Sequence, residues 1–151
     1  MKLSETSIEQ FLDTWPVARL ATLNSEGRLH QVPVVFVYYE GLLWSPVDGK
    51  PKRAGELARI ANAIAYPSAS LLLDHYTDDW LQLWWLRVDV ELQVVRLNPD
   101  ARNSKEIATA GVVRALRRKY SQYEDIPVLR DPPTLLSMQP KHISSWCAAP
   151  T

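Results

Sequence analysis

WLQLWWLRVDVELQVVRL, residues 80–97, is the longest β-like stretch of the sequence. In its second half, apolar side chains alternate with polar ones at every residue. The apolar set is Leu86, Val88, Val90, Leu92 and Val94, and the polar set is Arg87, Asp89, Glu91 and Gln93. Because successive side chains of a strand point to opposite faces, this alternation predicts a sheet with one buried face and one wet face.

Shorter β-like runs precede this stretch and are separated by turn sequences. Val17 to Leu23 is followed by a turn that contains Gly27, and a second run extends from Leu29 to Tyr39. A further turn leads into Leu42 to Ser45, so the first third of the chain is predicted to form a three-stranded meander. Pro33 interrupts the middle strand. Since proline cannot donate to a sheet ladder, we expect an edge, a bulge or a contact with another group there.

Three segments have helical spacing. The first carries a capping-box pattern that begins at Thr6 and Ser7, and it ends at Trp15. The second extends from Ala54 to Ala65 and stops before Tyr66-Pro67. The third is expected to be capped within Asn98-Pro99-Asp100 and to present an apolar stripe as far as Tyr123.

Two more extended segments, Leu71 to His75 and Leu135 to Trp146, complete the pattern. Short hairpin strands with segregated helices predict an α+β fold, and closure of the antiparallel sheet into a barrel would remove its exposed edges. At 151 residues, the chain is expected to form one domain, 1–151, with a sizeable core.

Composition excludes several classes of protein. The formal net charge is zero, from 17 basic and 17 acidic residues, so no global field attracts nucleic acid or an anionic membrane. The single cysteine, Cys147, rules out an internal disulfide, and the polar N-terminal segment does not match a signal peptide. No later segment approaches the length of an apolar membrane span. We therefore expect a cytoplasmic protein with no nucleic-acid or membrane partner.

The turn Lys50-Pro51-Lys52-Arg53 lies between a predicted strand and a predicted helix start. Backbone N–H groups and the positive end of a helix dipole favour an anion at such a position, and Lys50, Lys52 and Arg53 add charged donors. Phosphate is therefore the expected ligand. Taken alone, three basic residues in a turn also fit a solvated charge cluster.

Other chemistries have little support in the sequence. The three histidines, His30, His75 and His142, lie in separate segments without metal-binding spacing, so no metal site is expected. Cys147 and the neighbouring Ser144-Ser145 lack a nucleophile motif. Neither a dinucleotide-binding nor a P-loop glycine pattern occurs.

Several segments, taken together and in order, resemble the pyridoxamine 5'-phosphate oxidase-like split β-barrels, in particular a branch of coenzyme F420-dependent flavin/deazaflavin oxidoreductases. The resemblance extends from about Phe11 to Trp146. The segments are Arg19-Leu20-Ala21-Thr22-Leu23, Gly27, His30-Gln31-Val32-Pro33-Val34-Val35-Phe36, Asp48-Gly49-Lys50-Pro51-Lys52-Arg53, Asp74-His75-Tyr76-Thr77-Asp78-Asp79-Trp80 and Leu83-Trp84-Trp85-Leu86-Arg87. One difference is Val90, at a position where family members often have glycine.

The resemblance implies an α+β, antiparallel split β-barrel with flanking helices, a homodimer with two cofactor sites at its interface, and bound F420 or FMN. Val32, Pro33 and Val34 would border the flavin-like ring, while Ser45, Lys50, Lys52 and Arg53 would hold its phosphate. Trp85 and Trp146 are candidates for ring or interface contacts.

The expected reaction is hydride transfer between the cofactor and a small conjugated substrate. Because the cofactor supplies this chemistry, an acid or base residue is not required; His75 and Tyr76 are the candidates if one is used. A flavin-binding or haem-binding storage protein without turnover is the alternative. Single-stranded nucleic-acid binding is a third, against which the zero net charge counts.

Overall fold

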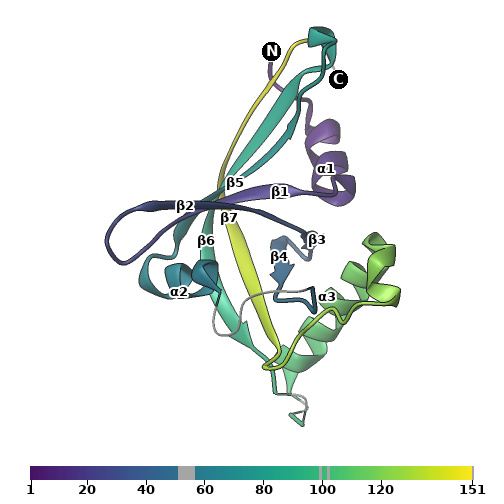
Figure 1. Ribbon diagram of the computed structural model, residues 1–151. Coiled ribbons are helices and arrows are strands. Elements are labelled where there is room, and N and C mark those ends of the chain that lie inside the picture. The colour runs from purple at the N-terminus through teal and green to yellow at the C-terminus, as the bar shows by residue number, and fades with distance from the viewer. Residues whose placement is uncertain (51–56, 99, 102, 151) are drawn as a thin grey trace.

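The structure is a computed structural model that describes residues 1–50, 57–98, 100–101 and 103–150. It contains a seven-stranded antiparallel sheet in the order β2-β1-β5-β6-β7-β4-β3 (Figure 1). The strands are β1 Ala18–Leu23, β2 Leu29–Val34, β3 Val37–Tyr39, β4 Leu42–Pro46, β5 Ser68–His75, β6 Trp84–Arg96 and β7 Thr134–Cys147. This arrangement confirms the predicted α+β, antiparallel architecture.

Two residues, Val35 and Phe36, connect the two edges of the sheet. β2 is the first strand in the spatial order and β3 is the last, yet β2 ends at Val34 and β3 begins at Val37. A connection of two residues spans roughly 10 Å at most. The sheet must therefore curl until its edges approach each other, which is the geometry of a barrel.

The predicted strand from Leu29 to Tyr39 is therefore two strands, and the prediction of a continuous three-stranded meander is wrong. β2 pairs with β1, whereas β3 pairs with β4, and β4 pairs with β7. The physical reason lies at Phe36, which is completely buried where the chain turns from one sheet edge to the other. Pro33 lies on the edge strand β2, opposite Arg19 of β1, as its missing N–H group predicts.

Strand β6, which the sequence predicts as the longest β-like stretch, begins later than predicted. Residues Trp80–Gln82 form a short 3-10 helix that Asp79 caps through its side chain, and the strand proper starts at Trp84. From Trp84 to Leu92, the observed burial follows the predicted alternation. The register of β6 with β7 shifts between Asp89 and Val90, where Lys141 of β7 is the unpaired residue. The bulge thus lies on β7 and does not require glycine at position 90.

Three α-helices flank the sheet: α1 Glu5–Thr14, α2 Ala58–Ala65 and α3 Ser104–Lys119. The N-cap of α1 is Ser4, which accepts a hydrogen bond from the backbone N–H of Ser7, so the predicted capping box at Thr6 and Ser7 is wrong. Asn103 caps α3 in place of the predicted Asn98-Pro99-Asp100 segment, because the Asn98 side chain makes a local turn with the N–H of Asp100.

The core lies on one face of the sheet. Leu20, Leu71, Leu73, Leu86 and Val88 are completely buried there. α1 packs on this core through Phe11 and Leu12, and a second cluster joins α3 to β3 through Val37, Val112 and Leu116. Within the described part of the chain, no helix is both long and apolar enough to cross a membrane.

Candidate functional site

Asp48 is the centre of a charged cluster just after β4. Its side chain is only 2% exposed, and its carboxylate forms an ion pair with the ammonium group of Lys50. The hydroxyl of Tyr123, from the short 3-10 helix Ser121–Glu124, donates a hydrogen bond of 2.7 Å to the same carboxylate. The backbone N–H of Lys50 donates a further hydrogen bond to Asp48, so the carboxylate is held from several sides.

Two arginines add positive charge to this cluster. Burial lowers the pKa of Arg59, the second residue of α2, and the positive charge of Arg130 lowers it further. The negative charge of Asp48 opposes both effects, which shows that the three side chains act on one another. We call Asp48, Lys50, Arg59, Tyr123 and Arg130 the anchor cluster. It contains three cations and one carboxylate.

The backbone of the 126–130 segment fixes the position of the anchor cluster. The N–H of Gly49 donates to the carbonyl of Pro127 at 2.9 Å, and the N–H of Arg130 donates to the carbonyl of Val47 at 2.9 Å. A Cβ atom at position 49 would lie 2.8 Å from Cδ of Pro127. Glycine is therefore required here by the close approach of the two segments.

The structure locates two of the four predicted phosphate ligands. Lys50 belongs to the anchor cluster, and its side chain is 48% exposed. Ser45 of β4 is buried, and its hydroxyl group has no hydrogen-bond partner among the described residues. The predicted ligands Lys52 and Arg53 lie outside the described residues.

Sequence reasoning missed the other members of the cluster. Asp48 was noted only as the first residue of a segment that resembles the family, and Tyr123 only as the end of an apolar stripe, while Arg59 and Arg130 were not candidates. A hydrogen bond between residues 75 positions apart leaves no trace in local spacing.

A second group of predicted residues lies on the face of the sheet opposite the core, which we call the outer face. On neighbouring strands, Pro33 pairs with Arg19, and Trp85 pairs with Trp146. A cleft of ≈ 430 Å³ lies on this face. Its lining includes Arg19, Leu72, Asp74, Tyr76, Trp85 and Arg87. An ion pair joins Arg19 to Asp74 across the cleft lining, and Arg87 lies 6.0 Å from the ring centre of Trp85.

The remaining predicted residues point elsewhere. Val34 is buried in the core, and Val32 packs against the core from the same strand. The ring of His75 packs against Trp15 and Trp84, with ring centres 5.6 and 6.4 Å away, whereas Tyr76 is exposed beside the outer-face cleft. The side chains of the two alternative acid or base candidates therefore lie in different environments.

The anchor cluster and the tryptophan pair lie at opposite ends of the sheet. Pro46, two residues before Asp48, pairs with Leu135 near the start of β7, while Trp146 is near the end of the same strand. Trp146 lies eleven positions after Leu135 in extended chain, which corresponds to roughly 35 Å. In Figure 1, β7 accordingly runs from the region of β4 and α3 to the far end, where both chain ends lie.

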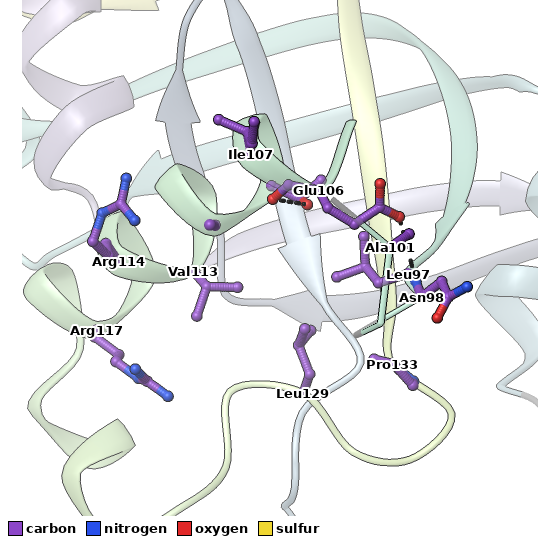
Figure 2. A pocket seen from close by; sticks show the side chains of 12 residues that line it. Leu97, Asn98, Ala101, Glu106, Ile107, Val113, Arg114, Arg117, Leu129 and Pro133 are labelled. Atoms are coloured by element: carbon purple, nitrogen blue, oxygen red, sulfur yellow. Dashed lines mark hydrogen bonds between the residues drawn. The ribbon is translucent and has the colours of Figure 1, made fainter. Parts of the chain in front are cut away.

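Figure 2 shows a larger cleft of ≈ 680 Å³ beside α3. Val113, Leu129 and Pro133 contribute apolar surface to it, and the exposed Arg114 and Arg117 border it. One carboxylate oxygen of Glu106 accepts a hydrogen bond from the N–H of Asn98, while the other oxygen is buried and has no partner within residues 1–50, 57–98, 100–101 and 103–150. None of the predicted site residues is among the described residues that line this cleft.

A metal centre has no support in the described part of the chain, where no three His, Cys, Asp or Glu side chains gather closely enough to hold an ion.

No protein-family model matches the sequence, and no curated protein matches it either. Solved structures provide the informative comparison.

An FAD-binding protein from Mesorhizobium loti has a TM-score of 0.70 at 17% identity, with 96% of this chain and 95% of that chain covered. The haem storage protein HutZ from Vibrio cholerae has a TM-score of 0.64 at 15% identity, covering 97% and 95% of the two chains. An F420 reductase has a TM-score of 0.58 at 17% identity, covering 90% and 94%.

A structure described as a putative pyridoxamine 5'-phosphate oxidase, from Corynebacterium glutamicum, has a TM-score of 0.59 at 15% identity and covers 96% of this chain and 90% of that chain. At such identities, the comparison establishes the fold. Together with the curled seven-stranded sheet and its flanking helices, these likenesses show that the chain has the split β-barrel fold of the pyridoxamine 5'-phosphate oxidase-like proteins.

Proposed function

We propose that this protein is a cytoplasmic homodimeric oxidoreductase that binds F420 or FMN and transfers a hydride to a small conjugated substrate. The observation that carries the proposal is the anchor cluster, a concentration of three cations around one carboxylate. It includes Lys50, one of the three cations of the basic turn that the sequence suggests as a phosphate site. Solved proteins of the same fold include an FAD-binding protein and an F420 reductase.

The donors in this region suit a phosphate group. Lys50, Arg59 and Arg130 supply positive charge, and arginine can donate two hydrogen bonds to one phosphate. The buried hydroxyl of Ser45 has no partner in the part of the chain that the structure describes and is available to donate. Leu57, at the N-cap of α2, has no side-chain acceptor for the first N–H groups of that helix, so those groups also favour an anion.

The distance between the anchor cluster and the tryptophan pair supports the proposed homodimer. If the anchor cluster and the Trp85–Trp146 pair serve one cofactor, a single chain cannot supply both, because they lie roughly 35 Å apart along β7. A second copy that packs its outer face against the first would bring its tryptophans toward the first copy's anchor. Arg19, Leu72 and Arg87 would then be buried between the subunits.

The bound cofactor would supply the hydride chemistry. The protein would fix its phosphate at the anchor cluster and exclude water from its ring through Trp85, Trp146 and Pro33. No protein acid or base is required for such a role. If one assists, the exposed Tyr76 on the outer face is better placed than His75, whose ring is packed between Trp15 and Trp84.

The decisive experiment combines native mass spectrometry with the absorption spectrum of the purified protein. We expect a dimer that carries two copies of a flavin or deazaflavin, either as purified or after addition of FMN or F420. Reduction of the bound cofactor, followed by reoxidation with conjugated acceptors, tests for turnover. A monomer that binds neither FMN nor F420 would contradict the proposal.

Charge removal at the anchor provides a second test. Arg59→Met should weaken FMN binding by about tenfold or more, because a charge-assisted contact to phosphate is lost. Binding of riboflavin, which lacks the phosphate, should change little. Arg114→Met, which removes an exposed arginine from α3, is the matched control.

Storage of a flavin or haem without turnover is the second candidate. The likeness to the haem storage protein HutZ favours it. A haem spectrum that persists through purification, or a bound flavin that no acceptor reoxidises faster than free flavin, would support storage over catalysis.

A further inference from the structure

The anchor cluster contains a group that is unfavourable for anion binding, the carboxylate of Asp48. It is nearly completely buried, so solvent screens its charge weakly. A phosphate that approaches Lys50 and Arg59 therefore meets a fixed negative charge at short range. A cluster built only to maximise phosphate affinity would not include this charge.

The carboxylate cannot turn away when a ligand arrives. Tyr123 donates to it at 2.7 Å, and Tyr123 is itself buried and packed against Tyr120, with ring centres 5.9 Å apart. The backbone around Asp48 is equally constrained, because Gly49 and Val47 are hydrogen-bonded to Pro127 and Arg130. Asp48 is thus a rigid part of the protein.

Lys50, in contrast, can move. Its side chain is 48% exposed, and its ammonium group lies 5.8 Å from the ring centre of Tyr123 while it pairs with Asp48. The ammonium group of Lys50 is carried on a flexible four-carbon chain. It can contact a phosphate at the surface of the cluster only if it divides its interaction between Asp48 and the phosphate or gives up Asp48. Binding therefore involves competition between two anions for one cation.

We infer that Asp48 is a built-in counter-anion that competes with the ligand's phosphate for Lys50 and so limits the affinity of the anchor, with Tyr123 as the positioning residue that holds its carboxylate in place. The inference rests on the proposed function, in which the anchor cluster binds phosphate. It assigns Asp48 a role opposite to that of a ligand-binding residue. This competition sets the phosphate affinity of the anchor cluster and its selectivity among anions, since a fixed negative charge repels a dianion more than a monoanion.

Removal of the charge with preservation of shape tests this directly. Asp48→Asn leaves an amide oxygen that can still accept from Tyr123, but it abolishes the competing charge. We expect inorganic phosphate and FMN to bind about tenfold more tightly to this variant, while riboflavin binding stays unchanged. Isothermal titration calorimetry on the intact protein measures all three ligands.

Tyr123→Phe should act in the opposite direction. The carboxylate then loses the hydrogen bond from Tyr123 and interacts more strongly with Lys50, so phosphate affinity should fall about threefold. In the Asp48→Asn background, the same substitution should have little effect on phosphate affinity, because the two residues act through one interaction. A structural role alone would not produce opposite signs or this coupling.

Matched controls separate local from global effects. Glu26→Gln removes one negative charge from an exposed turn, and Tyr66→Phe removes a hydroxyl at the exposed end of α2; neither should alter phosphate binding. Thermal unfolding and circular dichroism establish that each variant is folded.

The possible failures are distinguishable. If the wild-type protein binds no phosphate, FMN or F420, both the proposed function and this inference are overturned. If the wild type binds phosphate but Asp48→Asn binds it no more tightly, or loses affinity for phosphate and riboflavin alike, only the inference is overturned.

Discussion

The hydroxyl of Tyr120 forms hydrogen bonds with both backbone polar groups of Phe36. It accepts from the N–H of Phe36 at 3.0 Å, and its single hydrogen is shared between the carbonyl oxygens of Phe36 and Pro16, each 2.9 Å away. Phe36 is the residue at which the chain passes from one sheet edge to the other. One side chain at the end of α3 thus satisfies the backbone of the corner that closes the barrel.

Loss of this hydroxyl should destabilise the fold. Tyr120→Phe leaves the buried N–H of Phe36 without a partner, so the free energy of unfolding should fall by about 1–3 kcal/mol. Urea denaturation followed by tryptophan fluorescence measures the change. Tyr38→Phe, at a side chain that is 40% exposed, is the control and should be nearly neutral. Equal stability of the two variants would show that the Tyr120 contact contributes nothing.

Gly111 provides a test in which packing opposes helix propensity. It lies within α3, where alanine is ordinarily better than glycine by about 1 kcal/mol. A Cβ atom at position 111 would collide with the hydroxyl of Tyr39 from β3, so Gly111→Ala should lower the free energy of unfolding by about 1–3 kcal/mol. Arg114→Ala, on an exposed part of the same helix, should change it little. A stabilised Gly111→Ala variant would contradict the observed packing of β3 on α3.

Lys119 should give the protein a characteristic pH dependence. Burial lowers the pKa of its ammonium group from 10.5 to about 8, although the nearby Asp13 opposes the shift, and the group lies 3.8 Å from the ring centre of Phe36. Because the folded state releases this proton more readily than the unfolded state, stability should rise with pH between about 8 and 10.5.

Lys119→Met should remove that rise and stabilise the protein at pH 7 by about 1 kcal/mol, since partial exposure and the contact with Phe36 offset part of the desolvation. Denaturation at several pH values from 7 to 9.5 measures the difference from wild type. The pH range stops at 9.5 because Tyr120 affects stability at higher pH. Burial raises the pKa of Tyr120 to about 12 in the folded protein. Ionisation of this tyrosine in the unfolded chain therefore lowers stability above about pH 10. Lys141→Met is the control. Parallel profiles for Lys119→Met and wild type would refute the assignment.

The proposed dimer predicts the effect of a charge on the outer face. Leu72→Asp places a carboxylate beside Asp74 in the cleft that would face the partner, so we expect a monomer with weakened cofactor binding. Light scattering coupled to size-exclusion chromatography measures the mass. Ile107→Asp, at a residue of α3 that is 69% exposed, should leave the dimer intact. If Leu72→Asp remains a dimer, the outer face is not the interface.

The sequence was sufficient where structure depends on neighbouring residues. The alternation in Leu86 to Leu92 correctly predicted the two faces of β6, since side-chain direction in a strand is a local property. The end of α2 before Pro67 was likewise predictable from proline chemistry. The family resemblance correctly indicated the split barrel.

Local patterns failed where distant segments decide the outcome. Leu29 to Tyr39 looks like one strand, but buried Phe36 and its contact with Tyr120, 84 residues away, divide it in two. Aspartate is a residue type common in turns. Only the hydrogen bond from Tyr123 and the charge of Arg59 identify Asp48 as part of a charged cluster. Asn98 and Asn103 are equivalent capping candidates by residue type; the choice depends on where the preceding strand ends.

β7, the last strand along the chain, connects the two parts of the sheet. β7 pairs with β6 on one side and β4 on the other, so without it the sheet separates into β2-β1-β5-β6 and the hairpin β4-β3. During synthesis, both parts emerge before β7 and expose an unpaired edge, on β6 and on β4, that can join other chains. Folding of the barrel therefore waits for β7, and a chain whose synthesis terminates before residue 134 would be prone to aggregate.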